Sequence, residues 1–190
     1  MNASGLPATK APLGGVLPVL STPFRPDRRC DAPGLVRLVL HVAKAGAHGA
    51  VYPAIASEFA TLTPDEREMM VDTALSAARE CRLPLVVGIS ADTPEISQQL
   101  GRQAATGGAT AVMLMAPRSA GQEAVAVSRF FAAAADAVGD VPIILQNAPP
   151  PLGSCLLSST VLDVVRAVPA IRYVKEENIP CGQRITALIE

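Results

Sequence analysis

The segment LPLVVGIS (83–90), together with the following TPEISQQLGRQAATGG (93–108) and TAVMLMAP (110–117), decides the fold class of this chain. The first and third pieces are short, continuously apolar runs, which are typical of strands buried on both faces of a parallel sheet. The piece between them has the length and the spacing of a helix that connects two parallel strands. The segment therefore predicts a strand–helix–strand unit of the α/β class.

The same alternation continues in both directions and gives six strand-then-helix units. The helix over 63–80 has the clearest start, because Thr63 is a good N-cap, Pro64 takes the first helical position and Glu66 follows three residues after the cap. Strands are predicted at 16–24, 50–57, 84–90, 111–117, 142–148 and 171–176, and helices at 31–46, 63–80, 93–108, 122–139, 158–168 and from about 181.

Two architectures fit this alternation: an open doubly wound sheet and a closed (β/α)8 TIM barrel. No strand is followed by GxGxxG or GxxxxGK[ST], so the nucleotide-binding forms of the open sheet lose their usual support. Polar residues instead follow several different strands, which is how a barrel builds its active site. They are Ser21, Thr22, Ser57, Glu58, Ser90, Gln146, Asn147 and Lys175.

We predict a TIM barrel of which this chain holds only the first six βα units, with the open six-stranded sheet as the alternative. Residues 1–14 are expected to form a flexible N-terminal tail, and residues 15–190 a partial barrel domain that ends in the sixth helix. A complete barrel needs about 250 residues. The chain is therefore expected to be partial.

Composition argues against several classes of function. A net charge of −1, 3% aromatic residues and the absence of a Lys/Arg run make nucleic acid an improbable partner. The four cysteines show no CxxC spacing and the two histidines have no partners at ligand spacing, so we expect reduced thiols, no metal and no cofactor. Without a leader-like segment or an apolar stretch of about 18 residues, we expect a cytoplasmic protein with no membrane partner.

Lys175 is the candidate for chemistry. The chain has three lysines against thirteen arginines, and Lys175 alone stands at the end of an apolar strand. Because side chains alternate along a strand, Lys175 shares a face with Tyr173, and Gln146 occupies the matching face of the preceding strand. Burial inside a barrel would favour the free amine of Lys175, a nucleophile toward carbonyl carbon. The competing interpretation is a lysine that extends into water from the strand end.

Four stretches, STPF (21–24), SEFATLTPDER (57–67), PIILQNAP (142–149) and YVKE (173–176), make the chain resemble the dihydrodipicolinate synthase / N-acetylneuraminate lyase family of class I aldolases. The resemblance covers the chain from about residue 14. It implies a TIM barrel, a homo-oligomer (dimer or tetramer), and a Schiff base between Lys175 and a 2-keto acid.

The departures from the family pattern bear on the reaction. Gln146 replaces the tyrosine that acts as proton shuttle in most members, and an amide cannot do that work. Pro151 stands where the synthases carry an arginine for the second substrate, and Arg118 and Ser119 replace a pair of tyrosines. Ser57-Glu58 and the Gln-Asn-Ala-Pro segment instead resemble the L-2-keto-3-deoxyarabonate dehydratase branch.

These observations predict a Schiff-base-forming lyase that dehydrates a 2-keto-3-deoxy sugar acid, with Lys175 and Gln146 as catalytic residues. Ser57, Asn147 and Thr22 are weaker candidates for substrate contacts. Glu176 and Glu177 are expected to be solvated or to cap a helix, and the alternative is that they stabilise a nearby cation or act as acid/base groups. The alternatives are a pyruvate-dependent aldolase, a dihydrodipicolinate synthase-like enzyme, and a catalytically silent relative that only binds a keto acid.

Overall fold

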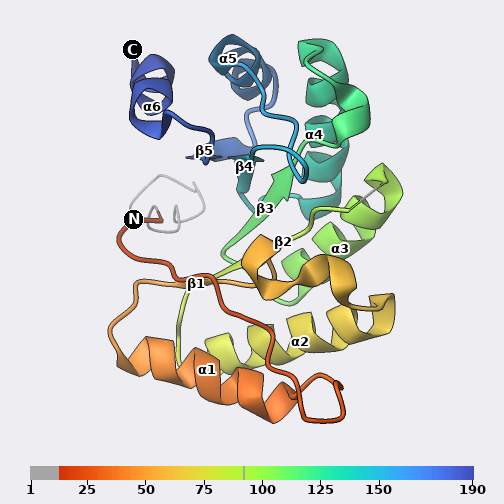
Figure 1. Ribbon diagram of the computed structural model, residues 1–190, viewed down its shortest axis with the longest axis vertical. Helices are drawn as coiled ribbons and strands as arrows, with labels where there is room; N and C mark the ends of the chain where they lie inside the picture. The colour runs from red at the N-terminus through yellow and green to blue at the C-terminus, as the bar shows by residue number, and fades with distance from the viewer. Residues whose placement is uncertain (1–12, 92) are drawn as a thin grey trace, which may run out of the picture.

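The computed structural model describes residues 13–91 and 93–190 and follows the predicted alternation (Figure 1). Most of the predicted tail, residues 1–12, lies outside the described residues. The strands are β1 (Ala50–Val51), β2 (Leu85–Gly88), β3 (Ala111–Met115), β4 (Ile143–Asn147) and β5 (Ile171–Glu176). The helices are α1 (Ala32–Lys44), α2 (Pro64–Glu80), α3 (Pro94–Thr106), α4 (Ala124–Val138), α5 (Ser158–Ala167) and α6 (Cys181–Ile189). Three short 3-10 helices are η1 (Ile55–Ser57), η2 (Phe59–Thr61) and η3 (Arg118–Ala120).

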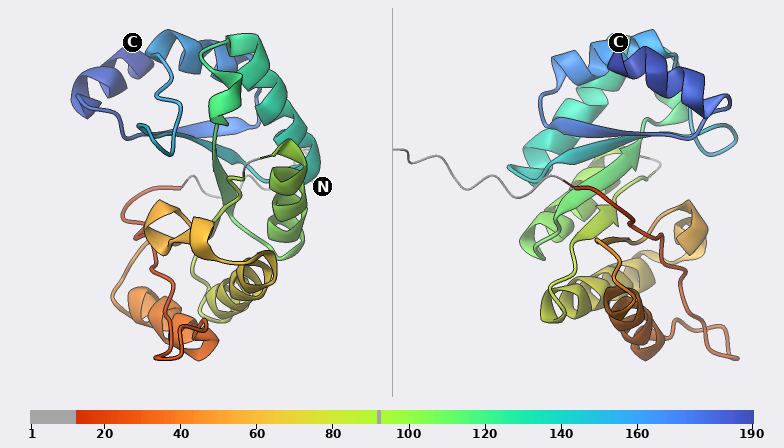
Figure 2. Two further views of the ribbon diagram at one scale, coloured as in Figure 1. Left: turned by 45° about the vertical axis from the view of Figure 1, so that its right-hand side comes forward. Right: turned by 90° about the vertical axis from the view of Figure 1, so that its left-hand side faces the viewer.

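The five strands form one parallel sheet in the order β1-β2-β3-β4-β5. Each strand therefore pairs with the next strand along the chain, as in a barrel, and not in the rearranged order of a doubly wound sheet. The helices lie along one side of the curved sheet, and the segment before α1 crosses its other side (Figures 1 and 2). The prediction of consecutive parallel neighbours is confirmed for these strands.

The first two predicted strands, 16–24 and 50–57, are shorter in the structure than predicted. Residues 16–24 make a single parallel bridge, between Val19 and Val51, where a full strand was predicted. Pro18 has no N–H and only accepts a hydrogen bond, from Val51 N at 2.9 Å. The predicted strand 50–57 ends after Val51, since Pro53 cannot donate to the ladder, and Ser57 falls in η1.

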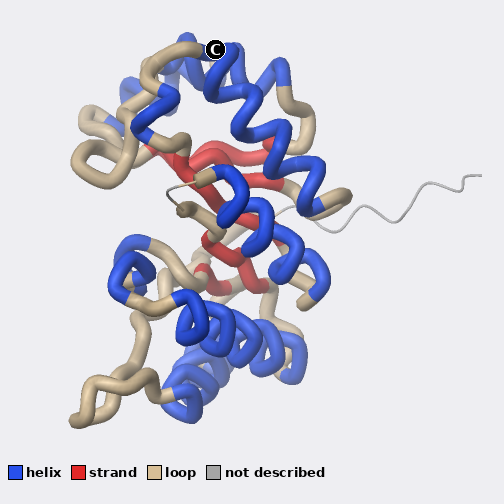
Figure 3. The backbone as a smooth tube through the Cα atoms, turned by 90° about the vertical axis from the view of Figure 1, so that its right-hand side faces the viewer, coloured by secondary structure: helices blue, strands red, loops and turns tan. Residues whose placement is uncertain are grey.

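The helices cover one face of the sheet, the outer face, which carries the main core (Figure 3). Val112, Leu114, Ile143 and Leu145 are fully buried there, in one cluster with helix residues such as Phe131. Full burial of each such aliphatic side chain stabilises the fold by about 1.5–3 kcal/mol. This layer fixes the strands relative to one another.

The opposite, inner face arranges its side chains in rows, as the interior of a barrel does. Val51, Ala54, Val86, Ala111 and Met113 form a small apolar cluster on this face. The register gives three rows: Val51, Val86 and Ala111; then Gly88, Met113, Ile144 and Tyr173; then Met115, Gln146 and Lys175. The third row lies nearest the carboxyl ends of the strands.

Two hydrogen-bonded contacts, one local and one between residues far apart in the sequence, tie particular residues to this fold. At the start of α2, Thr63 N donates to Glu66 Oε2 at 2.9 Å and Glu66 N donates to Thr63 Oγ1 at 3.2 Å, which confirms the predicted capping box. On the inner face, Leu13 N donates to Tyr173 Oη at 2.9 Å. The segment before α1 thus reaches the last strand of the sheet.

Candidate active site

Lys175 and Gln146 are direct neighbours across β4 and β5. Their Cα atoms are register partners, and both residues belong to the third inner row. The side-chain alternation that predicted a shared face for them is confirmed. Gln146 is 3% exposed, so its amide lies in the interior of the inner face beside the lysine.

Glu177 joins the two residues. Lys175 Nζ lies 2.8 Å from Glu177 Oε1, and Gln146 Nε2 donates to Glu177 Oε2 at 2.7 Å. One carboxylate therefore contacts both predicted catalytic side chains, one with each oxygen. The expectation that Glu177 is merely solvated or a helix cap was wrong, because residues 175 and 177 share one face of the extended chain.

The expected burial of Lys175 is not met, since its side chain is 38% exposed. The cause lies in the sheet, which ends at β5. Within the described ranges, no strand covers the far side of β5, and the carboxyl end of the inner face is open there.

A separate polar cluster lies behind this pair, on the outer face. Asn147 Nδ2 donates to Glu176 Oε2 at 2.8 Å, Asn178 N donates to Glu176 Oε1 at 2.8 Å, and Arg184 Nε lies 3.3 Å from Glu176 Oε1. The Glu176 side chain is 1% exposed, so its predicted solvation was wrong. Burial raises its pKa, but the bonds from Asn178 and Asn147 and the charge of Arg184 outweigh burial and hold the pKa below its usual value.

Asn147 has a structural place in this cluster. Besides its bond to Glu176, its Nδ2 donates to Leu156 O at 3.0 Å and its Oδ1 accepts from Leu156 N at 2.8 Å. These bonds fix the loop between β4 and α5. The side chain is 1% exposed and points away from the Lys175 face, and its predicted contact with a substrate stays a prediction.

Thr22 and Ser57 meet each other near the end of β1. Ser57 Oγ donates to Leu20 O at 2.5 Å and accepts from Ala54 N at 2.9 Å, while Thr22 Oγ1 donates to Ser57 O at 2.6 Å. Thr22 Oγ1 also lies 3.0 Å from the hydroxyl of Tyr52, whose pKa is raised by burial despite that hydrogen bond. The two residues have no hydrogen bond to Lys175 or Gln146 in the described parts of the chain. Their predicted substrate contacts also stay predictions.

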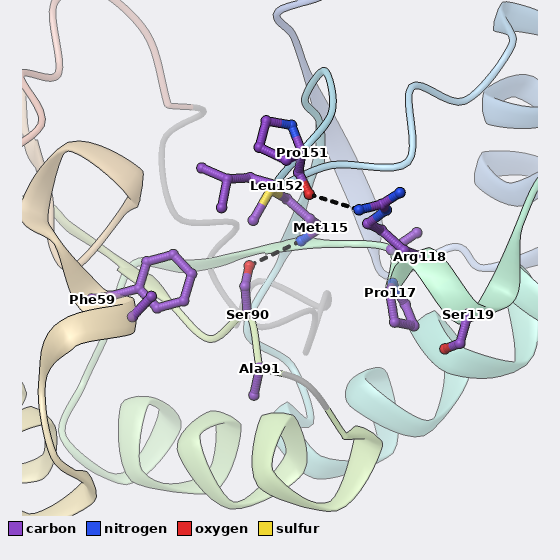
Figure 4. Close-up of a pocket in the computed structure, with 11 residues that line it drawn as sticks. Phe59, Ser90, Ala91, Met115, Pro117, Arg118, Ser119, Pro151 and Leu152 are labelled. Carbon is purple, nitrogen blue, oxygen red and sulfur yellow. Dashed lines mark hydrogen bonds between the residues drawn. The ribbon is translucent and has the colours of Figure 1, made fainter.

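A cavity of about 370 Å³ opens at the carboxyl ends of β2 and β3, beside the third row (Figure 4). Met115, the register partner of Gln146, lines it, and Met115 N donates to Ser90 Oγ at 3.1 Å. On the other wall, Arg118 Nη1 donates to Pro151 O at 3.4 Å. The cavity thus combines an apolar floor with a hydroxyl and an exposed guanidinium.

Arg67 is a buried cation that the sequence reasoning missed. Its guanidinium donates to Ser90 O and Gly88 O, each at 3.0 Å, and lies 4.9 Å from the centroid of the Phe59 ring. Burial lowers its pKa to about 10, against the opposing influence of Tyr52. The spacing of Arg67 with Met70, Val71 and Ala74 on one helix face could have indicated this burial.

No group of three or more His, Cys, Asp or Glu side chains in residues 13–91 and 93–190 is placed to hold a metal ion. In the same ranges, no helix has the length and apolar character needed to cross a membrane.

Residues 12–183 match the model of the dihydrodipicolinate synthetase family. A 4-hydroxy-tetrahydrodipicolinate synthase from Methylococcus capsulatus is 33% identical over 162 residues, which are 85% of this chain and 55% of the relative. One from Thermus thermophilus is 32% identical over 164 residues, or 86% of this chain and 54% of the relative. The chain thus spans about half the length of these curated relatives.

Solved structures of the same family share the fold of this chain. Dihydrodipicolinate synthase from Rhodopseudomonas palustris superposes with a TM-score of 0.83 and 26% identity over 93% of this chain and 58% of that one. A prophage protein of the same family from Escherichia coli K12, solved in complex with pyruvate, superposes with a TM-score of 0.84 and 25% identity. The match covers 92% of this chain and 58% of that one. The predicted TIM-barrel fold is confirmed, and the chain carries part of it.

Proposed function

Because the chain belongs to the dihydrodipicolinate synthetase family, we propose that Lys175 forms a Schiff base with the C2 carbonyl of a 2-keto acid. The observation that carries this proposal is the pairing of Lys175 with Gln146 in the row of inner-face side chains nearest the carboxyl ends of the strands. Active sites of TIM-barrel enzymes lie at that end. An amine placed there is a nucleophile for a carbonyl carbon.

Borohydride reduction in the presence of pyruvate tests the Schiff base. The complete protein is expected to gain one reduced keto acid, located on Lys175 by peptide mass analysis. Lys175→Ala should remove the adduct, and Lys44→Ala, which changes a lysine at the end of α1, should leave it in place. Absence of an adduct in the unaltered protein would favour a relative that binds a keto acid without catalysis.

For the reaction itself, we propose dehydration of a 2-keto-3-deoxy sugar acid. Gln146 supports this choice, because it stands in place of the tyrosine to which the family resemblance assigns removal of the C4 hydroxyl proton in aldol cleavage, and an amide is not a base. The cavity beside Met115 gives additional support: about 370 Å³ is more room than the three carbons of pyruvate need. Ser90 and Arg118 could there contact the hydroxyl groups of a longer substrate.

A second candidate is carbon–carbon bond formation or cleavage of the dihydrodipicolinate synthase or aldolase type. The names of the relatives from Methylococcus capsulatus and Thermus thermophilus favour it. Incubation with 2-keto-3-deoxy-pentonates and -hexonates separates the candidates. A semialdehyde product supports dehydration, whereas pyruvate plus an aldehyde would identify aldol cleavage. Formation of a condensation product from pyruvate and a second substrate that carries an aldehyde and a carboxylate would identify the synthase.

We also propose that the complete protein acts as a homo-oligomer, a dimer or a tetramer, as the family resemblance implies. Sedimentation equilibrium of the complete protein tests this. A single monomeric species at micromolar concentration would contradict it.

A further inference from the structure

We propose that Glu177 is the general base that removes a proton from C3 of the bound keto acid. This assignment rests on the Schiff base proposed above. Because position 146 carries glutamine in place of the family's tyrosine, another residue must act as the base. The Glu177 carboxylate lies 2.8 Å from Lys175 Nζ and accepts a hydrogen bond of 2.7 Å from Gln146 Nε2.

The backbone holds Glu177 in this position. Glu177 N donates to Asn147 O at 3.1 Å, which extends the pairing of β4 and β5 by one residue beyond Glu176. Side-chain alternation then directs residue 177 to the face of Lys175. Gln146 holds the second carboxylate oxygen, so a rigid strand orients the carboxylate on both sides. Such fixed orientation is what a proton transfer requires.

The distance suits the reaction. In an iminium formed by Lys175, C3 is bonded to C2 and so lies about 2.5 Å from Nζ. A carboxylate oxygen that contacts Nζ at 2.8 Å is therefore within reach of a C3 proton after a small rotation of its side chain. A general base needs to approach its proton to about 3 Å between heavy atoms.

The other acidic groups near these strands are already engaged. Glu176 is buried on the opposite face by its bonds to Asn147 and Asn178. The Tyr173 hydroxyl, one row from Lys175 on the same face, already accepts from Leu13 N. Among the described residues, Glu177 is the carboxylate paired with Lys175.

The step balances with this one base. Lys175 Nζ, as the free amine, adds to C2, and the adduct takes up one proton from solvent and loses water, which leaves a protonated imine; the same proton is released when the imine is hydrolysed. Glu177 takes a proton from C3, and the C–H electron pair forms the C2=C3 bond of an enamine. The enamine expels the C4 hydroxyl, and Glu177 returns its proton so that the group leaves as water. For a pentonate, a proton then moves from C5 to C3, which leaves a C4=C5 enol that tautomerises to the semialdehyde. Hydrolysis of the remaining imine frees Lys175 and completes the cycle.

Hydrogen exchange of pyruvate tests Glu177 without the complications of C4 chemistry. In D2O, a Schiff base with an active base replaces the methyl protons of pyruvate by deuterium, which proton NMR follows directly. Glu177→Gln is expected to slow this exchange by about 100-fold or more, the usual contribution of a general base. Borohydride trapping on Lys175 should persist. Glu80→Gln removes a carboxylate from the exposed end of α2 and should alter neither readout.

A second variant separates proton transfer from positioning. In Glu177→Ala, added formate should restore part of the exchange, since a small carboxylate can enter the space left by the side chain. Exchange at the normal rate in Glu177→Gln, or trapping that persists in Glu177→Ala without any rescue by formate, would overturn the assignment. Failure of the unaltered protein to form the borohydride adduct would instead refute the proposed Schiff base.

Discussion

Asn147 and Glu176 are hydrogen-bonded at 2.8 Å on the outer face of the same two strands that carry Gln146 and Lys175 on the inner face. The two pairs are consecutive in sequence on both strands, 146 with 175 and 147 with 176. The buried polar pair of the outer face therefore stands directly behind the pair of the inner face. A change in the outer pair is expected to disturb the fold, and a change in the inner pair to disturb chemistry.

The first prediction concerns Glu176→Gln. It removes a buried carboxylate that accepts from Asn147 and Asn178 and faces Arg184. Leaving Arg184 without its counter-charge should lower the free energy of unfolding by about 2–4 kcal/mol. Denaturant unfolding measures this change. Glu177→Gln is the matched control, expected to cost less than about 1 kcal/mol because the pair with Lys175 is partly solvated. An equal decrease in the free energy of unfolding in the two variants would contradict the view that the outer-face pair stabilises the fold and the inner-face pair does not.

The second prediction concerns acid. The pKa of Glu176 is lower in the folded chain than in the unfolded chain, so the unfolded chain takes up the proton first as the pH falls. The stabilisation is complete above about pH 4.3, the usual glutamate value, and is lost as the pH falls toward the folded-state pKa. The difference in denaturant midpoint between the unaltered protein and Glu176→Gln should therefore stay constant at neutral pH and shrink as the pH falls below about 4.3. A constant difference would refute this origin of acid sensitivity.

The third prediction concerns Arg67, whose guanidinium satisfies the carbonyls of Gly88 and Ser90 at the end of β2. Arg67→Ala should lower the free energy of unfolding by about 3 kcal/mol, since it leaves two carbonyls without donors and opens a hole beside Phe59. Thermal and denaturant unfolding report the change. Arg102→Ala, on the exposed side of α3, should lie within about 0.5 kcal/mol of the unaltered protein. A similarly small effect of Arg67→Ala would mean that water replaces the guanidinium.

The fourth prediction concerns Gly88. A Cβ at this position would lie 1.8 Å from Pro53 O, so the strand and the β1 loop cannot both keep their places. Gly88→Ala is expected to destabilise the fold by at least about 2 kcal/mol, a cost typical of overpacking. Gly182→Ala meets nothing within 4 Å in α6 and should stabilise slightly, through helix propensity. Comparison of the two unfolding midpoints tests the close approach, and a neutral Gly88→Ala would show that the loop moves freely.

The sequence was sufficient for the order of the elements, because continuous apolar runs and helix caps are local properties. It was also sufficient for the pairing of Lys175 with Gln146, since consecutive parallel strands and side-chain alternation determine which residues meet. Glu177 could have been placed by the same alternation, as residue 175 plus two. Its contact with both partners depends on side-chain rotamers and could not be predicted that way.

The remaining errors came from backbone constraints and polar contacts that hydropathy does not record. Ser57 lies in an apolar stretch that pattern alone reads as strand, but Pro53 ends the ladder and the chain turns into η1. The burial of Glu176 depends on Arg184 and Asn178, which follow it in the sequence and return to it through the turn before α6. Hydropathy records none of these partners, so a charged residue is assigned to solvent by default.

The hydrogen bond from Leu13 to Tyr173 spans 160 residues of sequence, whereas every strand of the sheet pairs with the next strand along the chain. Sheet growth can therefore proceed one unit at a time at a modest entropic cost of loop closure. The Leu13 contact forms only when the last strand is in place. In a folding experiment, protection of the Leu13 amide from hydrogen exchange should appear after that of the β2 and β3 amides, and would mark the moment at which the two ends of the sheet meet.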